Sequence, residues 1–402
     1  MKKILVLGAG AQGSVVVRHL DREAPVKEIV SADYDPGAAR TLVKGLKKAK
    51  ALQVDANNIE EILAAARGAQ LIVNALPPEF NPTVMEAALK VGANYQDLAT
   101  GPVKACGFVE SVTRELDLSD KFKSAGLCAL ICAGSAPGLT SVVGRHGADK
   151  LDSCQRIEIL MYDAIWTKRF IPFWWSPSTA FGDMAMRPTI WKDGKFVEVE
   201  PFGDPVIEDL RGIGPRRMVY HQHEEAITYP LFIKGLKYAA LRYGGANLEY
   251  ANKLYLHGLL GMEPVDINGA KVVPLDLVCR LTPPAPSTPQ EIREVVEEGI
   301  DIEEGALVVR IEGLKDGKEV RLDNYINAPG LTEASKKYGM SHETAITGQC
   351  AFLFTKLFVH NRIEHRGVFP PEALELETRE HYLQEAAKLD ISVDEIVETR
   401  LA

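Results

Sequence analysis

Residues 3–13 read Lys-Ile-Leu-Val-Leu-Gly-Ala-Gly-Ala-Gln-Gly, and a segment with apolar side chains at helical spacing follows them. A short apolar strand, a glycine turn and a helix in this order form the arrangement that binds the pyrophosphate of a dinucleotide. The first glycine permits the tight turn, the second lets the backbone approach the pyrophosphate, and the third lets the helix pack on the strand. The predicted phosphate-binding residues are Gly8, Gly10, Ala11, Gln12 and Gly13.

A second apolar run, residues 28–32, ends at Asp33, where an acidic residue is expected to bind the cofactor's ribose. An aspartate at this place accepts hydrogen bonds from the ribose hydroxyls and repels a 2′-phosphate. Tyr34 and Asp35 come next, with no immediate arginine. The predicted cofactor is therefore NAD rather than NADP.

Three further strand-like segments, residues 51–55, 71–76 and 93–98, alternate with helical stretches at 59–67 and 82–91. This alternation predicts an α/β, Rossmann-type, doubly wound parallel sheet. Ligands of such sheets lie beyond the carboxyl ends of the strands, which places Asp55 near the adenine side of the cofactor. The residues expected near the nicotinamide ribose are Asn74, Ala75, Leu76 and Pro77. A cap on the following helix is the alternative role for Asp55, and equally for Asp97.

After residue 150 the pattern changes to extended runs joined by tight turns, which indicates a second, α+β domain with an antiparallel or mixed sheet. Asp-Gly at 193–194 and at 316–317 predicts two hairpins. Apolar residues spaced three and four apart predict a helix over residues 231–243, and helical patterns return from about His342. The expected domains are residues 1–133 with 345–402 for the cofactor, and 134–344 for substrate and dimerisation.

The bulk composition excludes several classes of protein. With 402 residues, two domains are expected, and no stretch reaches the ~20 apolar residues of a membrane helix. A net charge of −9 argues against a nucleic-acid partner and favours a small-molecule ligand. The six cysteines contain no Cys-x-x-Cys pair, so neither a disulfide framework nor a metal site is predicted. The first apolar run breaks into glycines, unlike a signal peptide, so a cytoplasmic protein is expected.

Four segments occur in the order typical of one family. They are residues 8–13, residues 73–77, residues 95–98 and the Gly-Ser-Ala-Pro-Gly-Leu-Thr run at 134–140. The chain resembles the saccharopine dehydrogenase family, and within it the lysine 6-dehydrogenases, through Trp-Ser-Pro at 175–177 and residues 236–243. The resemblance implies an NAD-dependent oxidoreductase acting on the C–N bond of an amino acid by hydride transfer through an imine. It also implies a homodimer.

Such an amine must lose its proton before it releases hydride, and its solution pKa is ~10.4. The candidates for the proton acceptor are Asp97 and the cluster that contains His223 and Glu224, for which a solvated loop or helix start is the alternative. An amino-acid carboxylate would need an arginine, for which Arg242 or the pair Arg216 and Arg217 are candidates. Trp174, Trp175 and Tyr162 are candidates for the pocket wall.

Three other functions fit the same sequence. The first is an NAD-using aminoalkyl transferase or lyase of the homospermidine or carboxynorspermidine type, whose substrate is a polyamine. The second is a protein that binds NAD without turnover. The third is an aldehyde dehydrogenase with a cysteine nucleophile, Cys106 or Cys132.

Overall fold

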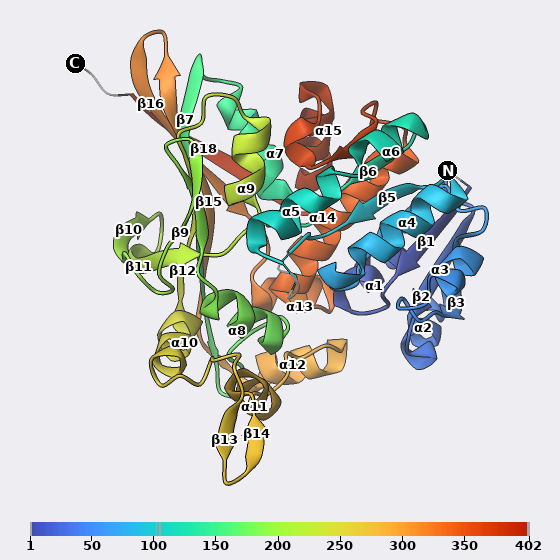
Figure 1. Ribbon diagram of the computed structural model, residues 1–402, viewed down its shortest axis with the longest axis horizontal. Helices are drawn as coiled ribbons and strands as arrows, with labels where there is room; N and C mark the ends of the chain where they lie inside the picture. The colour runs from blue at the N-terminus through green and yellow to red at the C-terminus, as the bar shows by residue number, and fades with distance from the viewer. Residues whose placement is uncertain (1, 102, 104–105, 400–402) are drawn as a thin grey trace. The chain divides into compact units, whose positions relative to one another are not determined.

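The computed structural model describes residues 2–101, 103 and 106–399. The chain divides into two compact units (Figure 1). Unit 1 takes the residues up to His146 together with Ile346–Asp390, and unit 2 takes Gly147–Ala345 together with the described residues from Ile391 onward.

Unit 1 is built on a parallel sheet that has seven strands among the described residues, in the order β17-β6-β5-β4-β1-β2-β3. This order, with β1 between β4 and β2, is that of a doubly wound nucleotide-binding sheet. The strands are β1 (Lys3–Leu7), β2 (Glu28–Asp33), β3 (Ala49–Gln53), β4 (Leu71–Asn74), β5 (Asn94–Asp97), β6 (Cys128–Leu130) and β17 (Gly367–Phe369).

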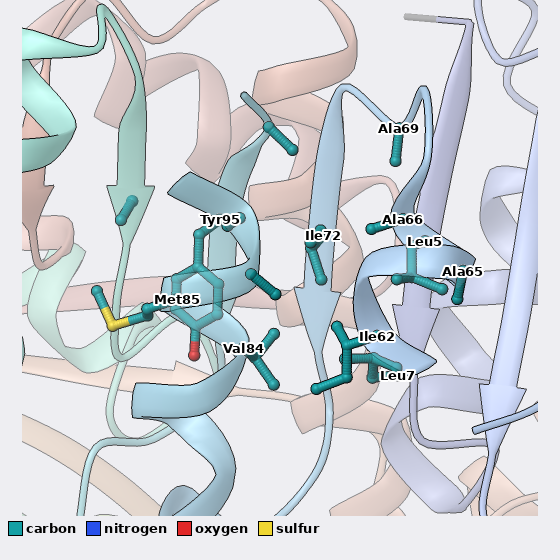
Figure 2. Close-up of a cluster of buried hydrophobic side chains, with 14 of the residues drawn as sticks. Leu5, Leu7, Ile62, Ala65, Ala66, Ala69, Ile72, Val84, Met85 and Tyr95 are labelled. Carbon is teal, nitrogen blue, oxygen red and sulfur yellow. The ribbon is translucent and has the colours of Figure 1, made fainter. Parts of the chain in front are cut away.

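Helices connect these strands and bury them, as parallel sheets require. Side chains from α3 and α4 pack with Leu5, Ile72 and Tyr95 of the sheet in one apolar cluster (Figure 2). The helices are α1 (Ala11–Leu20), α2 (Pro36–Val43), α3 (Ile59–Ala66), η1 (Pro78–Phe80), α4 (Asn81–Val91), α5 (Phe108–Leu116), α6 (Ser119–Ser124), α7 (Leu139–Ala148), α14 (His342–Val359), η2 (Pro371–Ala373) and α15 (Leu376–Ala387). The α/β prediction for this part of the chain is confirmed.

Unit 2 is built on a mixed sheet with nine strands among the described residues. Its main path is β10-β11-β12-β7-β15-β16-β18, in which only the β12–β7 pair is parallel, and β8 and β9 extend it beside β12. The strands are β7 (Ser153–Thr167), β8 (Thr189–Lys192), β9 (Lys195–Glu198), β10 (Val206–Leu210), β11 (Gly214–His221), β12 (Tyr238–Gly245), β15 (Ile300–Lys315), β16 (Lys318–Asn327) and β18 (Ser392–Thr399).

Short helices and one small hairpin complete unit 2. They are α8 (Pro177–Ala185), α9 (Glu225–Phe232), α10 (Ala246–Leu256), β13 (Val265–Ile267), β14 (Ala270–Val272), α11 (Pro274–Leu281), α12 (Pro289–Glu298) and α13 (Leu331–Tyr338). Both predicted Asp-Gly hairpins are present, at β8–β9 and at β15–β16, and both residues of each turn have positive φ. The prediction of a second domain with a mixed sheet is confirmed. Among the described residues, no helix has the length and apolar character needed to cross a membrane.

Two boundaries differ from the sequence prediction. The helix predicted over residues 231–243 is wrong, because this segment ends α9 and then forms β12. Residues 239–241 are buried in the middle of the sheet, and an apolar run buried on both faces lacks the alternation that marks an exposed strand. The sequence assigns residues 345–402 to the cofactor domain, but the described residues from Ile391 onward belong to unit 2, where β18 pairs with β16. Residues 134–146, which the sequence assigns to the second domain, belong to unit 1.

Candidate functional site

The glycine turn after β1 has the geometry that the sequence predicts. Gly8 has a φ of +95°, and a Cβ there would lie 2.8 Å from the carbonyl oxygen of Ala75. A Cβ on Gly13 would lie 1.9 Å from the carbonyl oxygen of Gly8, so only glycine allows α1 to begin so close to the turn. A Cβ on Gly10 would meet no atom within 4 Å, which leaves this side of the turn open for a phosphate group. Ala11 and Gln12 begin α1 directly above it.

Asp33 is held against this turn. One carboxylate oxygen accepts the N–H of Ala9 at 2.7 Å, and the other accepts the N–H of Asp35 at 2.9 Å. The carboxylate therefore stands at the end of β2 beside the glycine turn, where a ribose would present its hydroxyl groups.

The other predicted cofactor residues lie at neighbouring strand ends. Asp55 follows β3 and accepts the N–H of Asn57 at 2.9 Å, whereas Asn58 caps α3, so the helix-cap alternative for Asp55 does not hold. Asn74 is fully buried and donates to the Asn81 side chain at 2.8 Å. Ala75 and Leu76 form the wall against Gly8, and Pro77 directly precedes η1.

Asp97 lies in the interior of unit 1. It is 1% exposed, and its Oδ1 accepts the N–H of Cys132 at 2.8 Å. Burial and the neighbouring Asp97 carboxylate raise the pKa of Glu115 well above its usual range. Asp97 thus joins β5 to the turn after β6 and belongs to a buried carboxyl pair. Its role as a proton acceptor stays a prediction.

A second set of titratable groups lies in unit 2, between the end of β11 and the start of α9. The ring of His223 contacts the carboxylate of Glu225 through Nδ1 and lies 3.6 Å from the Glu224 carboxylate. Burial of His223 disfavours the charged ring, but the carboxylates of Glu225, Glu224 and Asp183 overcome this and raise its pKa to about 9. The helix start of the alternative is present, because α9 begins at Glu225 with Glu224 before it, but neither residue is solvated, because both are buried.

Asp183 of α8 completes this group, which we call the His223 cluster (Asp183, His223, Glu224 and Glu225). Burial and the Glu224 carboxylate raise the pKa of Asp183 to about 8. His221 lies beside the cluster, with its ring 6.5 Å from that of His223, and burial lowers its pKa to about 3. His221 is therefore neutral at neutral pH, whereas His223 carries a proton.

The structure separates Arg242 from the His223 cluster. Arg242 pairs across the strands with Tyr220, and neighbouring residues of a strand point to opposite faces, so Arg242 lies on the face away from His221 and Tyr243. Its guanidinium is bound to Glu158 at 2.9 Å and to the carbonyl oxygen of Asp204 at 2.8 Å. Arg242 therefore lies in a buried ion pair with Glu158, and its role toward the substrate stays a prediction.

The other arginine candidates divide between the two faces. Arg216 binds the Tyr162 hydroxyl and Glu304, on the face of Arg242. Arg217 lies on the face of His221 and makes an ion pair of 2.7 Å with the exposed Glu249.

A third group was not predicted from the sequence. Asp163 of β7, with His342 and Glu343 at the start of α14, places one ligand atom from each residue within 4.8 Å of the others. The His223 cluster contains a comparable trio, so each group has donors of the kind that hold a metal ion. Sequence reasoning missed the third group because 179 residues separate Asp163 from His342, and no local pattern joins them.

The glycine turn and the acidic end of β2 define a dinucleotide-binding domain, to which the chain adds a mixed-sheet unit. Residues 4–130 match the saccharopine dehydrogenase NADP binding domain, and residues 134–391 match the saccharopine dehydrogenase C-terminal domain. The chain belongs to the saccharopine dehydrogenase family.

The chain is similar to two relatives over nearly its whole length. It is 24% identical over 397 residues to the carboxynorspermidine synthase of Vibrio alginolyticus, covering 92% of both chains. It is 24% identical over 393 residues to the carboxyaminopropylagmatine dehydrogenase of Synechocystis sp., covering 93% of both. The apo saccharopine dehydrogenase (L-Glu forming) of Saccharomyces cerevisiae shares the fold, with a TM-score of 0.71 at 16% identity over 99% of this chain and 100% of that one.

Proposed function

We propose that the protein is an NAD(P)-dependent oxidoreductase that forms or oxidises the C–N bond of a carboxylated polyamine. The observation that carries this proposal is the His223 cluster, in which three carboxyl groups surround one protonated ring in a buried setting. At neutral pH the carboxylates of Glu224 and Glu225 outnumber the one charged ring, whereas the raised pKa of Asp183 keeps it protonated, and this negative charge suits a substrate with ammonium groups. The names of both relatives describe such a molecule, an oligoamine that bears a carboxyl group.

Hydride chemistry requires a nicotinamide, and the residues of unit 1 fit one. The open side of Gly10 admits a pyrophosphate, and the Asp33 carboxylate next to Ala9 suits a ribose with two free hydroxyls. A nicotinamide bound there supplies or accepts the hydride. The acidic residue favours NAD within the proposal, because the carboxylate would repel the 2′-phosphate of NADP.

The chain's own residues would handle the protons. Condensation of an amine with an aldehyde releases water, and this step is helped by an acid that protonates the departing hydroxyl. His223 is protonated at neutral pH because its pKa is raised to about 9, so it fits the acid rather than the base predicted from the sequence. The carboxylates of Glu224 and Glu225 would stabilise the positive charge of the iminium that follows.

The carboxylate of the substrate needs a cation on the same face of the sheet. Arg217 meets this condition, because its guanidinium is exposed in part and held only by the exposed Glu249 among the partners described. Exposed ion pairs are weak, about 0–1 kcal/mol, so a substrate carboxylate can replace Glu249 at little cost.

The proposal is tested by following NADH and NADPH consumption, each separately, with a diamine and an aldehyde that carries an α-amino acid group. The amines to use are 1,3-diaminopropane and agmatine, whose second basic group is a guanidinium. We expect consumption only when both partners are present, loss of at least 100-fold in kcat for His223→Gln, and no change for the exposed His257→Gln.

Oxidation of a free amino acid is the competing function, predicted from the resemblance to lysine 6-dehydrogenases. The same purified protein is therefore assayed with lysine and with saccharopine in the presence of NAD or NADP. Faster turnover of either compound than of the diamine and aldehyde pair would refute the proposal.

A further inference from the structure

Exposed apolar side chains concentrate in one short segment of unit 2. Among the described residues 17 large apolar side chains are exposed, and seven of them lie between Leu256 and Leu281. This segment contains the end of α10, the β13–β14 hairpin and α11. Single exposed apolar residues are ordinary, whereas a cluster of them marks a surface that binds a partner.

The β13–β14 hairpin extends from a closed base. The N–H of Leu275 donates to the carbonyl oxygen of Gly261 at 3.1 Å, so the two ends of the hairpin segment start from one place. The hairpin extends beyond α11 (Figure 1), and it forms a two-stranded sheet of its own among the described strands. A hairpin of two short strands is at best marginally stable in water unless another element covers its apolar side.

The turn gives the hairpin a defined shape. Asn268 and Gly269 both have positive φ, as a two-residue turn of type I′ requires. The N–H of Gly269 also donates to the side chain of Asp266 at 2.9 Å. The hairpin therefore presents fixed faces to a partner.

One face of the hairpin is apolar and the other is charged. Four side chains of alternating cross-strand pairs share one face, which we call the apolar hairpin face. They are Val265, Ile267, Ala270 and Val272. Val265 is 45% exposed and Ile267 is 49% exposed. The opposite face carries Asp266 and Lys271, whose charged groups lie 3.7 Å apart.

The exposed area of the segment is close to what a stable interface needs. Leu277 and Leu281 of α11 lie one helical turn apart, and Leu281 is 74% exposed. Seven side chains of this size, each about half exposed, offer on the order of 600 Å², whereas each partner buries about 800 Å² in an interface of standard size. A protein partner of ordinary size would therefore be held mainly by these side chains.

Charge favours a second copy of the chain over other occupants. The ionisable side chains of residues 262–281 nearly balance. They are Glu263, Asp266, Lys271, Asp276 and Arg280. A surface for anionic lipid or nucleic acid would be rich in lysine and arginine, whereas this chain carries a net charge of −9. A nearly neutral apolar surface suits an equally neutral one, which a second copy provides.

The edges of the nine-stranded sheet are less suited to such a contact. The edge strand β18 carries Asp394, Glu395 and Glu398, and the edge strand β10 carries Glu208 and Asp209. Charged side chains on an edge strand oppose pairing with another strand, because they would lose water on contact. The apolar hairpin face has no such charge.

We propose that two copies of this chain associate by packing the apolar hairpin face of one against that of the other. A two-fold axis brings the same surface of both copies together, and an apolar face without charge is complementary to itself. Association would cover Val265 and Ile267 of both copies and leave Asp266 and Lys271 in water. A homodimer is also expected from the family resemblance, and the hairpin gives its contact a place on the chain. This inference does not depend on the proposed reaction.

Sedimentation velocity of the full chain over a wide range of concentrations tests the proposal. The variants Val265→Ser and Ile267→Ser alter the apolar hairpin face. Lys271→Ser, on the charged face, is the control within the hairpin. Ile207→Ser is the control for loss of an exposed isoleucine elsewhere, since Ile207 of β10 is 68% exposed. Thermal melts check that each protein is folded.

We expect a dimeric wild type whose dissociation constant rises at least about 100-fold in Ile267→Ser, because each dimer loses the side chain twice, and about 10-fold in Val265→Ser. Both controls should dimerise like the wild type. A wild type that is monomeric at every concentration overturns the inference, and so does a dimer that persists in both folded hairpin variants. Binding of the monomeric wild type to phospholipid vesicles, lost in Ile267→Ser, would identify a membrane as the occupant and also overturn it.

Discussion

Replacement of Glu225 by glutamine tests the electrostatic account of the His223 cluster. The Glu225 carboxylate is the strongest of the groups that raise the pKa of His223 to about 9, and burial acts in the opposite direction. Without this charge the pKa of His223 should fall to its ordinary value of ~6.5 or below, a decrease of at least about 2 units. The amide keeps nearly the same shape, so packing changes little.

The same change alters how stability depends on pH. A histidine whose pKa is raised in the folded state stabilises the protein fully below pH ~6.5, and this contribution is lost as the pH rises through 9. The rise from 6.5 to about 9 corresponds to on the order of 3 kcal/mol. The difference in unfolding free energy between the wild type and Glu225→Gln should therefore be largest near pH 6 and shrink by roughly this amount near pH 9.5.

Two measurements check this prediction. Histidine ring resonances are followed by NMR as a function of pH, with His223→Gln to assign the signal among the nine histidines. Urea unfolding at several pH values gives the free energies. An unchanged titration of His223 in Glu225→Gln, or a stability difference that does not vary between pH 6 and 9.5, would refute the reasoning.

Three further predictions concern the cofactor domain and the mixed sheet. In Gly13→Ala, the added Cβ would stand 1.9 Å from the Gly8 carbonyl oxygen, so we expect loss of NAD(P) binding by at least 100-fold, measured by fluorescence titration. Asp33→Ala should weaken NAD binding by about 1.5–3 kcal/mol and raise the affinity for NADP relative to that for NAD. Unchanged affinity for both cofactors would show that this carboxylate does not hold the ribose. Arg242→Met should lower the unfolding free energy by about 3 kcal/mol, because it breaks the buried pair with Glu158, and it should leave KM unchanged. A rise in KM without a loss of stability would instead show that Arg242 binds the substrate.

Some features of the cofactor domain could be predicted because they are local in sequence. The position of Gly13 follows from its contact with the Gly8 carbonyl, five residues earlier, and that of Gly8 from the positive φ that the turn requires. The acidic end of β2 follows from a spacing that the strand, helix and strand unit imposes. The alternation of strands and helices predicts a parallel sheet for the same reason.

The errors arose where tertiary burial decides the outcome. The segment over residues 238–245 has helical spacing of its apolar residues, yet it becomes a strand because β7 and β11 flank it on both sides. The face of the sheet that Arg242 occupies is likewise not revealed by the sequence. Once the register with Tyr220 is known, its side chain points to Glu158.

The sequence by itself determined the dinucleotide turn, the acidic residue beside it, the α/β and mixed-sheet classes and the family. These depend on short patterns whose geometry the backbone dictates. Only the tertiary structure decided which titratable groups meet. Asp183 joins His223 from a helix 40 residues away, and Asp163 meets His342 across 179 residues. A pKa near 9 depends on charge, burial and distance together, and these exist only after β11, α8 and α9 have packed.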